Sequence, residues 1–223
     1  MSQIDTPVIR MKADLDEMFE TVGMQLHKTK DAMQNFDKDL ARDVIQREKR
    51  VNSQELQIDR AAENFIALFN PVAIDLRFVL AVLKINSNLE RIGDIAEGIS
   101  KYIVESSSSL NEDVLEESNI MPMYDAALMM LYDVKQSFEK EDTVIARKVF
   151  KTDEYLDHIN LEAIAILSTL IKKNPAIAED ALYAISIIRK LERIGDQVKN
   201  IAEEIIFYLE AKVLKHKGDM KRD

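Results

Sequence analysis

The hexapeptide LERIGD occurs twice, at residues 89–94 and again at residues 191–196. Each copy places a glutamate four residues before an aspartate, so both carboxylates lie on one face of a helix. Like charges at this spacing repel each other, and a bound cation is one way to offset the repulsion. The other way is a positive charge from a neighbouring arginine or from an adjacent helix. The acidic stripes comprise Glu90, Asp94 and Glu97 in the first copy, and Glu192, Asp196 and Asn200 in the second.

A second helix in each half carries acidic residues at positions where the spacing of apolar residues requires a buried side chain. These residues are Glu48 and Asp153, and Asn52 and Asp157 follow one turn later. A buried carboxylate needs a partner. The chain contains no cysteine, which excludes thiolate ligands. Because oxygen ligands from facing helices can hold one or more Fe, Mn, Mg or Zn ions, these residues predict metal binding.

Two other interpretations of the acidic residues stay open. An acidic stripe that serves only solubility would suit a structural adaptor. A di-metal carboxylate oxidase or a metal-storage protein in a helical bundle would combine inward glutamates with Glu-x-x-His motifs. None of the three histidines has a glutamate three positions earlier. Since neither a nucleophile with its base nor a glycine-rich phosphate loop is recognisable, the sequence predicts a protein that is not an enzyme.

Long helices must position these residues. Five Gly and four Pro in 223 residues favour an all-α fold, and apolar spacings of four and three indicate bundles with coiled-coil-like packing. The Asn-Pro pair at residues 70–71 recurs at residues 174–175, which indicates a duplicated unit and therefore two tandem three-helix bundles, at residues 1–109 and 110–223. The expected helices span residues 5–35, 38–69, 72–104, 122–139, 142–172 and 176–213.

Charge and hydropathy limit the partners and the location of the protein. The formal net charge of −10 repels a phosphate backbone, so nucleic acid is not an expected partner. The first residues have no apolar core of signal-peptide length, and no segment approaches the roughly 18 apolar residues that a transmembrane helix needs. We therefore expect a cytoplasmic protein.

The motifs resemble those of the PhoU family of phosphate-specific transport regulators. The resemblance rests on the two LERIGD copies, on the run DLRFVLAVLKINSNLERIGD at residues 75–94, and on the Asn-Pro pair that precedes the same helix. It extends over essentially the whole chain. Its most specific feature is the paired Glu-xxx-Asp signature, which occurs in register in both halves.

The resemblance implies a fold and a role. The fold is two three-helix bundles related by pseudo-twofold symmetry, with clusters of iron or other divalent cations at the acidic motifs. The role is repression of the phosphate-starvation response when phosphate is plentiful, between the ATPase of the phosphate transporter and a sensor histidine kinase. A homodimer or higher oligomer, and contact with the membrane through these partners, are also implied.

The first half departs from the family pattern at two positions. Gly98 stands where the second half has Asn200, and the acidic pair of the second helix is Glu48 with Asn52. The second half keeps both carboxylates of that pair. We therefore expect the second half to bind metal if only one half does.

Overall fold

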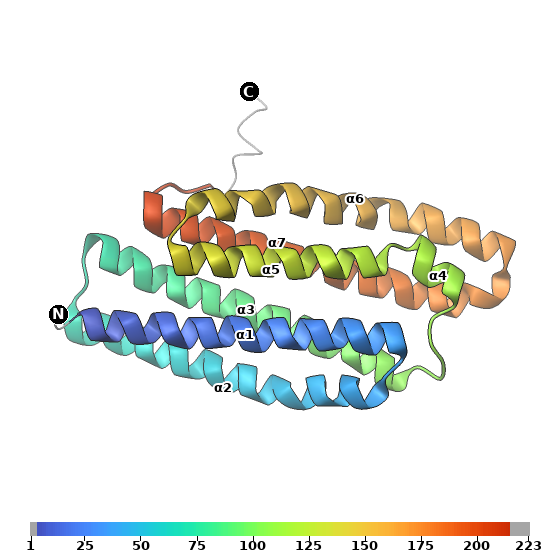
Figure 1. Cartoon of the computed structure of the whole chain (residues 1–223), viewed down its shortest axis with the longest axis horizontal. Helices are drawn as coiled ribbons and strands as arrows, with labels where there is room; N and C mark the ends of the chain where they lie inside the picture. Colours follow the sequence, from blue (N-terminus) through green and yellow to red (C-terminus); the bar gives the residue numbers. More distant parts are fainter. Residues whose placement is uncertain (1–3, 215–223) are drawn as a thin grey trace, which may run out of the picture.

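The computed structural model describes residues 4–214, in which every regular element is helical (Figure 1). The α-helices are α1 (Asp5–Asn35), α2 (Lys38–Phe69), α3 (Ala73–Glu105), α4 (Glu112–Glu117), α5 (Ile120–Lys140), α6 (Thr143–Lys173) and α7 (Ala178–Glu210), and the 3₁₀ helix η1 spans Pro175–Ile177. The predicted all-α class is confirmed. The predicted halves also include residues 1–3 and 215–223, which lie outside the described part of the chain.

Two antiparallel three-helix bundles lie side by side along a common long axis (Figure 1). The first consists of α1, α2 and α3, and the second of α5, α6 and α7. They pack together through α3 against α7 and through α1 against α5. One continuous apolar core runs through both bundles. The tandem arrangement predicted from the repeated motif is confirmed.

The helix boundaries follow from capping groups in the sequence. The Asp37 carboxylate accepts hydrogen bonds from the backbone amides of Asp39 and Leu40 at the start of α2, at 3.0 and 2.9 Å. Asp142 caps α6 in the same way, through the amide of Val144 at 2.8 Å. Each cap satisfies amides that have no partner within the helix.

Four details differ from the sequence-based boundaries by more than one residue. The connection between the bundles contains the short helix α4, because the Asn111 side chain accepts hydrogen bonds from the amides of Asp113 and Val114 and caps the start of the helix. Helix α5 begins at Ile120, so Pro122 occupies its first turn, where a missing amide hydrogen costs little. Pro175 opens the 3₁₀ turn η1 before α7 begins. Helix α7 ends at Glu210 rather than at residue 213.

The apolar seams of the two motif-bearing helices are buried, as predicted. The sixteen positions that follow the apolar spacings of four and three in these two helices are at most 5% exposed. They are Phe78, Val82, Ile85, Leu89, Ile92, Ala96, Ile99 and Ile103 in α3, and Ala184, Ile187, Leu191, Ile194, Val198, Ile201, Ile205 and Tyr208 in α7. The Leu and Ile of each LERIGD copy therefore serve packing.

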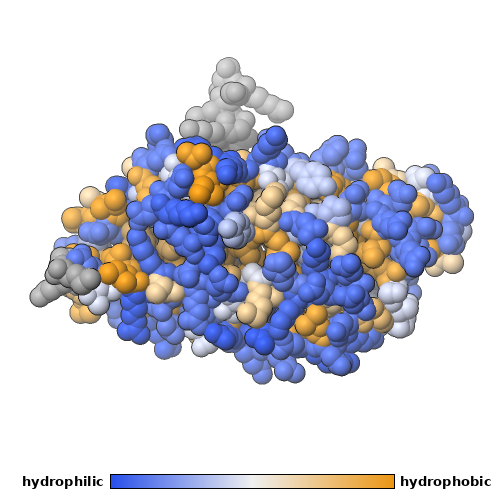
Figure 2. Space-filling view, in the orientation of Figure 1, coloured by the Kyte–Doolittle hydropathy of each residue, from blue (hydrophilic) through white to orange (hydrophobic). Residues whose placement is uncertain are grey.

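One face of the molecule is largely hydrophilic. Figure 2 shows that hydrophilic residues cover most of the face formed by α1 and α5, with smaller apolar areas between them. Within residues 4–214, no helix combines the length and the apolar composition that a membrane crossing requires.

Candidate metal centres

The glycine of each LERIGD copy lets a carboxylate of the facing helix approach the backbone. A Cβ atom on Gly93 would lie 2.9 Å from Glu48 Oε2, and a Cβ atom on Gly195 would lie 3.2 Å from Asp153 Oδ1 and 2.6 Å from Leu156 Cδ1. Such distances are too short for an alanine without displacement of its neighbours. The motif thus fits α3 against α2, and α7 against α6, at the two positions where the acidic residues are buried.

The carboxylate of Glu48 is buried among acidic residues. Glu48 is only 4% exposed, although it occupies a seam position that would ordinarily be apolar. Gln25 on α1 donates a hydrogen bond to Glu48 Oε2 at 3.0 Å. Within residues 4–214, Glu48 Oε1 is buried without a hydrogen-bond partner. Burial raises the pKa of Glu48 to about 7, and the negative charges of Asp94, Glu97 and Glu90 add to the increase.

The remaining acidic residues of the first stripe line the outer side of this site. Burial, followed by the charges of Asp94 and Glu55, raises the pKa of the half-buried Glu90. Asp94 is exposed. Glu97 forms an ion pair with Lys101 one turn later at 2.6 Å. The structure thus brings Glu48 together with the acidic stripe of α3, as the sequence predicts, and adds Glu55 from α2.

The second half contains a cation that the sequence reasoning missed. Asp153 is 4% exposed, and the ammonium group of Lys199 donates hydrogen bonds to Asp153 and, at 3.0 Å, to Asp196. Burial raises the pKa of Asp153, and Lys199 only partly opposes this increase. Burial by itself lowers the pKa of Lys199, but its hydrogen bonds to the two aspartates outweigh this effect and raise it.

The half-buried Glu192 completes the acidic group of the second half. Burial raises its pKa, and the charges of Asp196, Asp157 and Asp153 raise it further. Because a negative charge nearby raises a carboxyl pKa by favouring the neutral form, these causes place the four carboxyl groups in one electrostatic environment. The structure therefore brings together the carboxylates that the sequence predicts in this half.

Three other predicted ligands are less buried than Glu48 and Asp153. Asn52 and Asp157 are exposed on the outer faces of α2 and α6. Asn200 Nδ2 donates a hydrogen bond to Asn88 Oδ1 of α3 at 3.4 Å, so this amide lies at the contact between the bundles. The corresponding residue Gly98 leaves room for Lys190, because a Cβ atom there would lie 2.9 Å from its Nζ. The Gly98–Asn200 difference is therefore linked to bundle packing.

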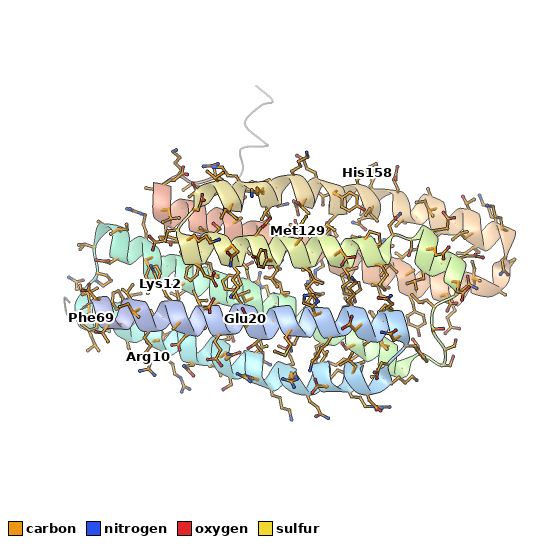
Figure 3. The ribbon with its side chains drawn as sticks, viewed as in Figure 1. Arg10, Lys12, Glu20, Phe69, Met129 and His158 are labelled. Atoms are coloured by element: carbon orange, nitrogen blue, oxygen red, sulfur yellow. The ribbon has the colours of Figure 1, made fainter. Side chains whose placement is uncertain are left out.

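The chemistry of the donor atoms fits a hard or borderline cation, although the ligands do not form a complete coordination sphere. The groups are carboxylates and amides, and within residues 4–214 the buried Glu48 Oε1 has no hydrogen-bond partner. Within residues 4–214, no group of three His, Asp or Glu side chains is arranged to hold a metal ion without rearrangement. His158 lies on the outer face of α6, where its Nε2 is 3.3 Å from Glu162 (Figure 3).

The family model of the PhoU domain matches two segments of the chain, residues 15–103 and residues 120–205. Each segment lies within one bundle. Among curated relatives, the phosphate-specific transport system accessory protein PhoU of Edwardsiella tarda is 32% identical over 97% of this chain and 88% of its own length. The protein of the same name from Escherichia coli K12 is 31% identical over 99% of this chain and 91% of its own.

Solved structures agree with the sequence comparisons. The crystal structure of PhoU from Pseudomonas aeruginosa matches 94% of this chain and all of its own, with a TM-score of 0.88 and 25% identity. The phosphate transport system regulatory protein PhoU from Streptococcus pneumoniae matches 96% of this chain and all of its own, with a TM-score of 0.83 and 25% identity. The two curated relatives are named as accessory proteins and the Streptococcus pneumoniae protein as a regulatory one, none of them as an enzyme, and the chain belongs to the PhoU family.

Proposed function

We propose that this protein regulates phosphate uptake and signalling as an accessory protein of a phosphate-specific transport system. It would couple the transporter ATPase to a sensor histidine kinase and repress the phosphate-starvation response when phosphate is plentiful. The observation that carries this proposal is the similarity to accessory proteins of phosphate-specific transport over 97–99% of the chain, since both bundles are included. The relatives' names give no support to an oxidase or a metal-storage protein.

The proposed setting follows from the same role. The protein would act in the cytoplasm, as a homodimer or higher oligomer, and would reach the membrane only through its partners. The net charge of −10 supports contact with basic protein surfaces rather than with nucleic acid. The helix surfaces would carry the signal between the partners. For one partner to influence the other, this protein must have two states whose surfaces make different contacts with them.

We further propose that the acidic motifs bind divalent or trivalent metal ions, namely Fe, Zn, Mn or Mg. The support comes from Glu48 and Asp153, which are buried opposite the acidic stripes of α3 and α7. A bound cation would offset the cost of burying these carboxylates and the repulsion within each stripe. The side chains around each site would need to rotate inward to complete the coordination.

Alkaline phosphatase expression at high phosphate tests the regulatory role. A host that lacks its own PhoU is complemented with the wild type, with Glu192→Ala combined with Asp196→Ala, or with the matched control Glu63→Ala combined with Glu154→Ala. The control removes two exposed glutamates outside the motifs. We expect repression by the wild type and the control but not by the motif variant.

The other outcomes separate the two parts of the proposal. Repression by all three proteins would make the second acidic motif dispensable. A lack of repression by the wild type, with normal expression and helical content, would contradict the assignment to phosphate signalling.

A further inference from the structure

The two acidic motifs differ in the charge at one position. The repeat aligns Glu90 with Glu192 at an offset of 102 residues, and the same offset aligns Glu97 with Lys199. The first motif therefore has an acidic residue where the second has a basic one. Since the hexapeptide before this position is identical in the two copies, the exchange introduces a positive charge beside the same glutamate and aspartate in the second copy.

Lys199 bridges the two helices of the second site. Its ammonium group donates hydrogen bonds to Asp153 Oδ2 on α6 and to Asp196 Oδ1 on α7. The Asp153 side chain is 6% exposed and the Lys199 side chain is 29% exposed. Because solvent screens such a pair only weakly, a metal ion that binds Asp153 must first displace the ammonium group or accept its repulsion.

In the part of the chain that the structure describes, no hydrogen bond joins the buried carboxylate of the first site to such a cation. Glu48 is 4% exposed, and its Oε2 accepts a hydrogen bond from Gln25, whereas its buried Oε1 has no hydrogen-bond partner within residues 4–214. The charged groups that act on Glu48 most strongly are Asp94, Glu97 and Glu90, all of them acidic. A buried oxygen without a partner, surrounded by negative charge, favours binding of a cation from solution.

We propose that Lys199 is a built-in counter-ion that replaces a metal ion in the second half, so that the first half binds a divalent cation at least about tenfold more tightly than the second. This inference rests on the metal binding proposed above. It reverses the order of sites expected from the acidic residues alone, because that expectation did not include Lys199. The family signature is thus present in both halves, while the chemistry of the two sites differs.

Counting bound Mn²⁺ per full-length chain tests the proposal. Metal is first removed with a chelator and the chelator is dialysed away, and free Mn²⁺ is then measured by EPR during titration. Lys199→Met removes the charge and keeps most of the side-chain volume. The matched control is Lys151→Met, an exposed lysine on α6. We expect tight Mn²⁺ binding to rise roughly twofold in Lys199→Met, because the second site becomes available, and to stay at the wild-type level in the control.

Two further variants locate the bound ions. Glu48→Gln should abolish tight Mn²⁺ binding to the chain that retains Lys199, whereas Asp153→Asn should leave it unchanged. The opposite pattern, or equal losses in both variants, would overturn the proposed order of the sites and leave metal binding itself intact. A lack of tight Mn²⁺ binding in both the wild type and Lys199→Met would refute the proposed metal binding, and this inference with it.

Thermal unfolding in the presence of chelator tests the role of Lys199 without any metal. A counter-ion should be needed for stability, since its removal leaves Asp153 buried without a partner. We expect Lys199→Met to have a Tm several degrees below that of Lys151→Met, and excess Mn²⁺ to reduce this difference. Equal Tm values of the two variants in chelator would overturn the inference, whatever the wild type binds.

Discussion

The buried Glu48 should make the stability of the protein depend on pH. Its pKa is raised from 4.5 to about 7 in the folded protein, chiefly by burial. A raised carboxyl pKa contributes stability that is fully present below pH 4.5, where both states are protonated. That stability is lost as the pH rises through the folded-state pKa, since the folded protein must then ionise a buried group. Glu48→Gln removes the ionisation and should therefore remove this loss.

The size of the effect follows from the pKa change. A rise from 4.5 to about 7 corresponds to about 3 kcal/mol, at about 1.4 kcal/mol per pH unit. This is an upper value, because Asp94, which contributes to the change, is exposed and its charge is screened by solvent. We expect the free energy of unfolding of the wild type, relative to Glu48→Gln, to fall by about 2 kcal/mol between about pH 4.5 and pH 8.5.

Urea unfolding followed by circular dichroism measures this difference. Both proteins are measured in chelator across the pH range, so that no metal ion stabilises the ionised carboxylate. The control is Glu63→Gln, which changes an exposed glutamate of the same helix. The difference in free energy of unfolding between the wild type and Glu63→Gln should not change over this pH range. A difference between the wild type and Glu48→Gln that stays constant from acid to alkaline pH would refute the reasoning that Glu48 ionises at a cost.

Three further predictions concern packing, capping and the contact between the bundles. Gly195→Ala should lower the free energy of unfolding by about 1–3 kcal/mol in urea titrations, because the new Cβ atom would lie 2.6 Å from a buried side-chain carbon. As a control, Gly23→Ala should raise the free energy of unfolding by about 0.5–1 kcal/mol, because its Cβ atom would meet only ordinary contacts. Stabilisation by both substitutions would contradict the packing argument. Asp37→Ala should cost about 1 kcal/mol through loss of the α2 cap, and an unchanged urea midpoint would contradict that role. Lys135→Met should lower the Tm more at low salt than at high salt, because Lys135 on α5 contacts Glu20 of α1 at 2.5 Å; equal changes would show that the pair contributes no net charge attraction.

The sequence predicts the arrangement of helices well because its signals are local and periodic. Residues 5–35 and 38–69 were expected to be helical, and α1 and α2 have these bounds. The apolar spacing in α3 and α7 identifies the buried seam, since side chains that share a helix face share an environment. The repeated hexapeptide identifies the duplication. Asn111 is a local capping signal too, but a single turn has no apolar period by which α4 could be recognised.

The repeat also identifies which acidic residues are unusual. Glu48 and Asp153 interrupt an apolar pattern, so their burial is predictable from the sequence, and both are 4% exposed. The partner of each carboxylate is not predictable in this way. Lys199 lies 46 residues from Asp153 along the chain, and Gln25 lies 23 residues from Glu48. Pairs at such separations depend on how neighbouring helices are rotated and aligned.

The helices, their buried faces, the duplication and the acidic positions are therefore predictable from local spacing and repeated motifs. Which side chains meet across helices depends on the packing of the helices. That packing places Gly93 and Gly195 against buried carboxylates, Asn200 against Asn88, and Lys199 against Asp153. Such contacts are not predictable from one helix, because electrostatic compensation acts over a few ångströms in space, whatever the distance along the chain.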